Sequence, residues 1–136
     1  MNWFLDAFKY KYLDFTGRAR RTEYWMFMLF HFLIIFVLAF LYAILEDVGM
    51  SQIGMFLLVV YVLMSLLPAL ALTIRRLHDT GRSGWYYLLS FIPYIGGIII
   101  FIFTVMDSEM GQNKWGPNPK SAHTDEINEI GKPLDF

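Results

Sequence analysis

Three long apolar runs, residues 24–45, 53–74 and 85–106, constrain what this chain can fold into. Each run has 22 residues and contains no Asp, Glu, Lys or Arg. An α-helix rises about 1.5 Å per residue, so each run would reach about 33 Å as a helix, enough to cross a hydrocarbon core of about 30 Å. The sequence therefore predicts an all-α membrane protein with three transmembrane helices.

The segments outside the three runs are too short to bury a core of their own, so we expect a single membrane domain over residues 1–120. Aromatic residues at helical spacing near the N-terminus predict an amphipathic interfacial helix over residues 2–15. Residues 107–120 are rich in Gly, Pro and Asn and predict turns. Residues 121–136 are polar, which predicts a disordered tail.

The distribution of charge predicts the orientation in the membrane. Five Lys or Arg precede the first run, residues 46–52 contain none, and residues 75–84 contain three. Because Lys and Arg near span ends favour the cytoplasmic side, we expect the N-terminus and the loop 75–84 to be cytoplasmic. Three spans would then place the C-terminal tail in the periplasm. The net charge of −1 argues against nucleic acid as a partner, and the lack of cysteine excludes disulfides and thiolate metal sites.

Polar side chains gather at the predicted cytoplasmic ends of the runs. One interpretation is a clasp, in which Glu23 and Asp79 pair with arginines and lock the spans together. The other is a cradle for anionic lipid headgroups, because guanidinium groups bind phosphate oxygens in pairs and basic pockets at span ends recognise headgroups. The candidate residues for either role are Arg18, Arg20, Arg21, Glu23, Arg75, Arg76, His78, Asp79, Arg82 and Trp85.

Other polar or helix-breaking residues within or next to the runs support two further hypotheses. His31 is either a functional group in the membrane or a neutral imidazole bonded to a neighbouring helix. Together with Pro68, which frees a carbonyl near Met64, and Pro93, it would suit a small oligomeric transporter or channel. His78 next to Asp79 would suit an interfacial enzyme acting on lipid phosphates.

Catalysis has little support in the sequence, because adjacent residues on a helix point about 100° apart and so cannot form a dyad. The chain also contains no G-x-S-x-G, H-E-x-x-H, Walker or Rossmann pattern. We therefore expect no catalytic residues, no cofactor and no metal site.

Four ordered blocks carry a resemblance to a known family: residues 15–25, 75–85, 92–96 and 113–119. In these blocks the chain resembles the bacterial inner-membrane family of domain of unknown function 805, the YhaH-like proteins. The resemblance implies a location in a bacterial inner membrane and supplies no activity.

From the residues and the resemblance together, we expect a non-enzymatic integral inner-membrane protein. It would bind anionic phospholipid or a membrane partner through the arginine-rich loop 75–84, and it would form a homo-oligomer.

Overall fold

The computed structural model describes Lys9 and residues 12–120, and these residues form helices joined by turns. The chain folds as two compact units. Among the described residues, the first unit contains Lys9, residues 12–14 and residues 22–72, and the second contains residues 15–21 and 73–120. The helices, in chain order, are α2 (Arg21–Asp47), α3 (Ser51–Asp79), the 3₁₀-helix η1 (Gly84–Phe91) and α4 (Gly96–Val105).

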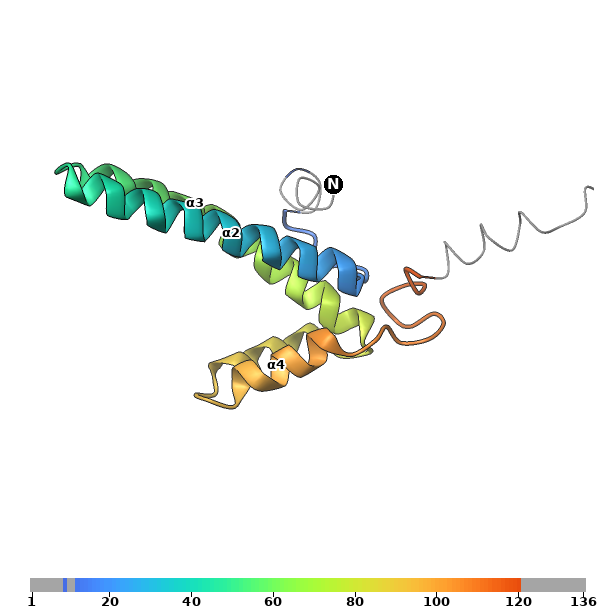
Figure 1. Cartoon of the computed structure of the whole chain (residues 1–136). Helices are drawn as coiled ribbons and strands as arrows, with labels where there is room; N and C mark the ends of the chain where they lie inside the picture. The colour runs from blue at the N-terminus through green and yellow to red at the C-terminus, as the bar shows by residue number, and fades with distance from the viewer. Residues whose placement is uncertain (1–8, 10–11, 121–136) are drawn as a thin grey trace, which may run out of the picture. The chain divides into compact units, whose positions relative to one another are not determined.

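Helices α2 and α3 lie side by side in the first unit (Figure 1) and contain the first two apolar runs. Each is long and apolar enough to cross a membrane. The turn between them depends on Gly49, whose positive φ of 76° lets its N–H bond the carbonyl of Glu46 at 3.0 Å. Gly54 allows close packing, since a Cβ there would lie 2.8 Å from the backbone of Tyr42.

A proline interrupts the hydrogen bonding of α3 at Pro68. Because proline has no N–H, the carbonyl of Met64 one turn earlier loses its normal partner. The hydroxyl of Tyr12 donates a hydrogen bond to this oxygen at 2.8 Å. The carbonyl that the sequence predicts to be freed is therefore satisfied by a side chain from the segment before α2.

The prediction of one transmembrane helix over residues 85–106 is wrong. The run forms η1 and α4, which pack against each other as a helical hairpin (Figure 1). Eight residues of 3₁₀-helix rise about 16 Å and ten residues of α-helix about 15 Å, about half the hydrocarbon thickness each. The turn begins at Pro93, and the next residue, Tyr94, has a positive φ of 64°.

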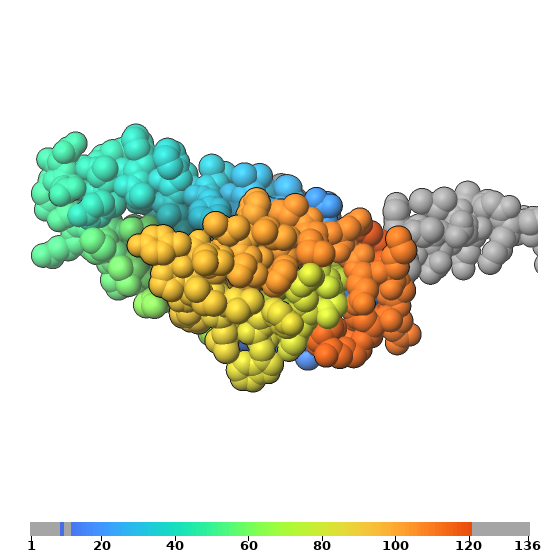
Figure 2. Space-filling model, turned by 90° about the horizontal axis from the view of Figure 1, so that it is seen from below, coloured from blue at the N-terminus to red at the C-terminus, as the bar shows by residue number. Residues whose placement is uncertain are grey.

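Residues 107–119 follow this hairpin, which returns the chain to the end from which it left. The backbone N–H of Glu109 bonds the carbonyl of Asp79 at 2.8 Å, and Figure 2 shows the orange residues after α4 beside the yellow-green end of α3. Such a contact is incompatible with a span that separates residue 107 from residue 84. The prediction that the chain after residue 106 lies across the membrane from the loop 75–84 therefore fails for residues 107–119.

Two further predictions fall wholly or largely on residues outside the described part of the chain. The interfacial helix was expected over residues 2–15, of which only Lys9 and residues 12–15 are described. The tail was expected over residues 121–136, which all lie outside it.

Candidate functional site

The polar cluster predicted from the sequence is centred on Asp79, the last residue of α3. Its carboxylate accepts hydrogen bonds from Arg18 Nε at 3.0 Å, from Arg76 Nη1 and from the hydroxyl of Ser108. The side chains of both ion pairs are buried, with at most 1% of their surface exposed. Asp79 therefore pairs with Arg18 from another segment and with Arg76 from its own helix, whereas the clasp interpretation expects pairs that lock the spans together.

Arg76 ties the end of α3 to two other segments. Its guanidinium donates to the carbonyl of Thr104 at 3.1 Å and to that of Met106, at the end of the hairpin. It also donates to the carbonyl of Ala19, at 3.3 Å. Because isolated buried charges are costly, this set of acceptors lets an arginine lie inside the protein.

The segment 15–21, which we call the strap, lies against the end of α3. The N–H of Ala19 bonds the carbonyl of Arg75 at 3.1 Å, and Arg20 Nε donates to the carbonyl of Pro119 at 2.7 Å. Arg18 donates to carbonyl oxygens of the segment after the hairpin in addition to Asp79. The strap is therefore bound by side-chain and backbone contacts together.

His78 has partners different from those of Asp79. Its ring stacks on the indole of Trp115, with centroids 4.4 Å apart and planes 10° apart, and Nδ1 lies 3.3 Å from the carbonyl oxygen of Gly17. The amide of Asn113 donates to the backbone carbonyl of His78 at 3.0 Å. His78 and Asp79 thus contact different residues, as expected because adjacent residues on a helix point in different directions.

The other predicted residues are dispersed. Arg82 places its guanidinium 4.0 Å from the ring centroid of Phe103 and donates to the carbonyl of Thr80. Trp85, at the start of η1, is 78% exposed. Arg21 is exposed at the first residue of α2, and Glu23 follows in the first turn of that helix. Glu23 belongs to the first unit. In the two ion pairs that define the cluster, the acidic residue is Asp79.

Sequence reasoning missed four contributors from the segment after the hairpin. The composition of this segment predicts turns alone, yet it supplies Ser108, Glu109, Asn113 and Trp115 to the cluster. The block 113–119 is one of the four that carry the family resemblance, so the resemblance could have identified Asn113 and Trp115. Ser108 and Glu109 lie outside all four blocks.

Close to the cluster, Asp107 is exposed and pairs with Lys120. The hydrogen bond from Lys120 Nζ, with a second from the backbone N–H of Ser108, lowers the pKa of the Asp107 carboxyl. Among the residues that the structure describes, no group of three or more His, Asp or Glu could hold a metal ion.

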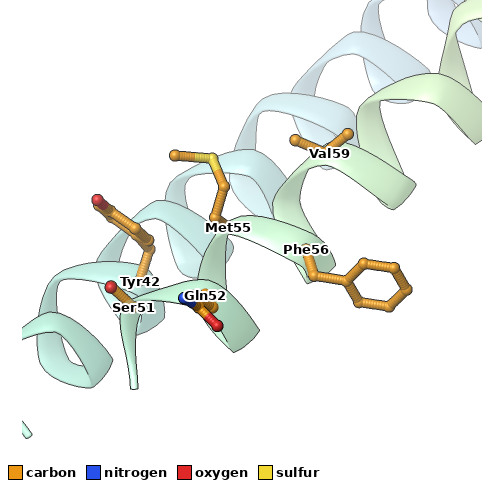
Figure 3. A pocket seen from close by; sticks show the side chains of 6 residues that line it. All are labelled: Tyr42, Ser51, Gln52, Met55, Phe56 and Val59. Atoms are coloured by element: carbon orange, nitrogen blue, oxygen red, sulfur yellow. The ribbon is translucent and has the colours of Figure 1, made fainter. Parts of the chain in front are cut away.

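Two features of the first unit are further candidates for sites. Nδ1 of His31 lies 3.1 Å from the hydroxyl of Tyr61 on α3, and its ring stacks on Phe27. A hollow of about 490 Å³ lies at the other end of the two helices (Figure 3), with few polar atoms in its wall. It is lined by Tyr42, Ser51, Gln52, Met55, Phe56 and Val59.

Comparison with known protein families identifies the family of this chain. The family described as "Protein of unknown function (DUF805)" matches residues 12–117. The chain belongs to this family. The DUF805 match includes the strap, the end of α3, the hairpin and the turn around Trp115, which together hold the cluster.

Curated relatives are similar over nearly their whole length. Inner membrane protein YhaH of Escherichia coli K12 is 43% identical over 120 residues, which cover 88% of this chain and 98% of the relative. Inner membrane protein YhaI of the same strain is 42% identical, with 88% and 97% covered. No solved structure matches. This DUF805 chain is thus a membrane protein by its relatives and by its two long apolar helices.

Proposed function

We propose that this DUF805 protein is a non-enzymatic inner-membrane protein that binds anionic phospholipid headgroups at the cytoplasmic face through its second unit. The observation that carries the proposal is a charge imbalance. Residues 15–21 and 73–120 of this unit contain eight Arg or Lys and three Asp or Glu, and residues 121–136 add one Lys and four Asp or Glu. The unit therefore carries an excess of two positive charges in a chain whose net charge is −1, and its positive charge is concentrated in residues 15–21 and 73–120. Cations near an anionic leaflet contribute about 1 kcal/mol each to membrane attraction.

The proposal assigns different roles to buried and exposed cations. Arg18 and Arg76 are occupied by Asp79 and by carbonyl oxygens, so they hold the unit together. Arg21 and Lys114 are exposed and Arg82 is partly exposed, so these three can meet phosphate groups. The exposed Trp85 at the start of the hairpin suits the boundary between headgroups and acyl chains.

The proposed topology has two spans, α2 and α3, and a re-entrant hairpin formed by η1 and α4. Five Lys or Arg before the first run and three in residues 75–84, against none in residues 46–52, support a cytoplasmic second unit. Because residues 107–119 contact Asp79, they lie on the same side. We propose that the chain leaves the hairpin in the cytoplasm, in place of the periplasmic tail expected from three spans.

The transporter and enzyme alternatives have less support. The hydroxyls of Ser65 and Thr104 donate to carbonyls in their own helices, at 3.1 and 2.8 Å, and so need no polar path. For an enzyme, a lipid phosphate would have to come within hydrogen-bond reach of the imidazole of His78, which is buried. Self-association stays a prediction.

Native mass spectrometry of the detergent-extracted protein with cardiolipin and phosphatidylglycerol tests the proposal. We expect Arg21→Gln, Arg82→Gln and Lys114→Gln combined to weaken retention of these lipids roughly hundredfold, at about 1 kcal/mol for each cation. The matched control keeps the charges as Arg21→Lys, Arg82→Lys and Lys114→Arg, and should retain lipid. Equal lipid retention by the two triple variants would remove the headgroup proposal. The same spectra report the oligomer mass.

A further inference from the structure

The guanidinium group of Arg18 is surrounded by acceptors from the end of α3 and from the turn that follows the hairpin. Nε donates to Asp79 Oδ1 at 3.0 Å, and Nη2 donates to the carbonyls of Asp79 at 3.2 Å and Glu109 at 2.6 Å. Nη1 donates to the carbonyls of Gly111 at 2.8 Å and Gly116 at 3.4 Å. An arginine has five N–H donors, so every donor of Arg18 has an acceptor. Four of the five acceptors are backbone carbonyls, which carry no net charge.

These acceptors are held in place by contacts that do not involve Arg18. The backbone N–H and carbonyl groups of Asn113 and Gly116 bond each other at 3.1 and 3.0 Å. The side-chain amide of Asn118 donates to the carbonyl of Glu109 at 3.2 Å, and the N–H of Glu109 bonds Asp79. Gly111 has a positive φ of 73°, a conformation that favours glycine. The receptor is therefore built by the end of α3 and the turn that follows the hairpin.

We propose that Asp79 and residues 109–116 form a guanidinium-binding site that the strap fills with Arg18. The ring of acceptors matches a planar, forked cation and discriminates against a compact ammonium ion, which presents its donors tetrahedrally. The site therefore takes a free guanidinium-class cation when the side chain of Arg18 is removed. In the intact chain Arg18 of the strap occupies this site, and the acceptors hold the strap by binding its guanidinium group specifically.

Chemical rescue tests this proposal. In Arg18→Ala, hydrogen exchange of peptides covering residues 15–21 and 107–119 should be about tenfold faster than in the natural chain, because charge-assisted hydrogen bonds are lost. Millimolar guanidinium chloride should restore the protection of residues 107–119, and the same concentration of ammonium chloride should not. The matched control is Arg82→Ala, whose guanidinium lies on Phe103, and guanidinium chloride should leave its exchange unchanged.

Two further experiments identify the source of the ligand and control for misfolding. In the first, an N-acetylated arginine amide replaces guanidinium chloride and shows whether the site also binds the side chain of a separate arginine. Slower exchange of residues 107–119 with either compound supports the site. Arg18→Lys keeps the charge, so guanidinium should displace the lysine, protecting residues 107–119 while residues 15–21 exchange faster. Native-like exchange in α2 and α3 with no response to guanidinium in either variant, or equal rescue by ammonium, would overturn the proposal.

Discussion

At the scale of single residues, Tyr12 and Pro68 show how the chain compensates for a proline in an apolar helix. Proline at position 68 leaves the carbonyl of Met64 without a helical N–H. An unsatisfied carbonyl in hydrocarbon costs several kcal/mol, so a substitute donor is strongly favoured. The hydroxyl of Tyr12 supplies it at 2.8 Å and thereby ties the segment before the strap to the middle of α3.

A double-mutant cycle tests this pairing. Tyr12→Phe should lower the free energy of unfolding by about 1 kcal/mol, since it removes only the hydroxyl. In the Pro68→Ala background the same change should cost close to nothing, because the N–H of residue 68 then bonds Met64 within the helix. Unfolding midpoints of the four chains in detergent measure the coupling. An equal cost in both backgrounds would mean that the hydroxyl does not replace the missing N–H.

At the scale of elements, the hairpin depends on its turn as much as on its apolar residues. Pro93 removes a donor, Tyr94 takes a positive φ, and the N–H of Gly96 bonds the carbonyl of Ile92 at 2.9 Å. Gly96 and Gly97 are adjacent in sequence but stand in different surroundings. A Cβ on Gly96 would overlap the carbonyl oxygen of Leu89 in η1, whereas a Cβ on Gly97 would have nothing within 4 Å.

The two glycines therefore provide a matched pair of substitutions. Gly96→Ala should destabilise the hairpin by about 2 kcal/mol or more, because backbone must move to admit the methyl group. Gly97→Ala should leave its stability unchanged or raise it, since alanine favours helix over glycine. Protease resistance of residues 84–105 in detergent compares them. Equal sensitivity of the two variants would show that η1 and α4 do not pack as described.

At the scale of the whole molecule, the proposed re-entrant hairpin would determine which side of the membrane the chain reaches after α4. A single span would carry it across, whereas two helices of about half the membrane thickness return it. The ion pairs of Asp79 and the carbonyl contacts of Arg18 then join three segments that are far apart in sequence. The second unit is thus closed by polar contacts on its cytoplasmic side under the proposed topology.

Single-cysteine labelling tests this topology directly, because the chain contains no natural cysteine. With a membrane-impermeant maleimide on spheroplasts, Val48→Cys should be labelled from outside. Gln112→Cys should be labelled only after the inner membrane is lysed, as should the control Ser83→Cys in the loop before the hairpin. Labelling of Gln112→Cys from outside while Ser83→Cys stays protected would establish a third span and refute the hairpin.

The arginine cluster could be predicted only in part. The pairing of Asp79 with arginines follows from opposite charges at one membrane level, and the contacts of Arg18 and Arg76 agree with it. The choice among arginines does not follow, because Arg18, Arg20 and Arg21 are separated by at most three positions and differ by the direction of their side chains. Glu23 and Asp79 looked equivalent in the sequence, but the first lies in α2 and the second at the centre of the cluster.

By itself the sequence determined the class of the protein, its two long helices and the end that carries its positive charge, because hydrophobic length and charge are properties of composition along the chain. Only the tertiary structure decided that the third apolar run folds back on itself. Length and hydropathy are the same for a span and for a hairpin, and the difference arises from a proline, a positive φ and the contact of Gly96 with Leu89. The acceptors around Arg18 likewise could not be predicted from the sequence. Most of them are backbone carbonyls, which every sequence provides and which only the fold brings together.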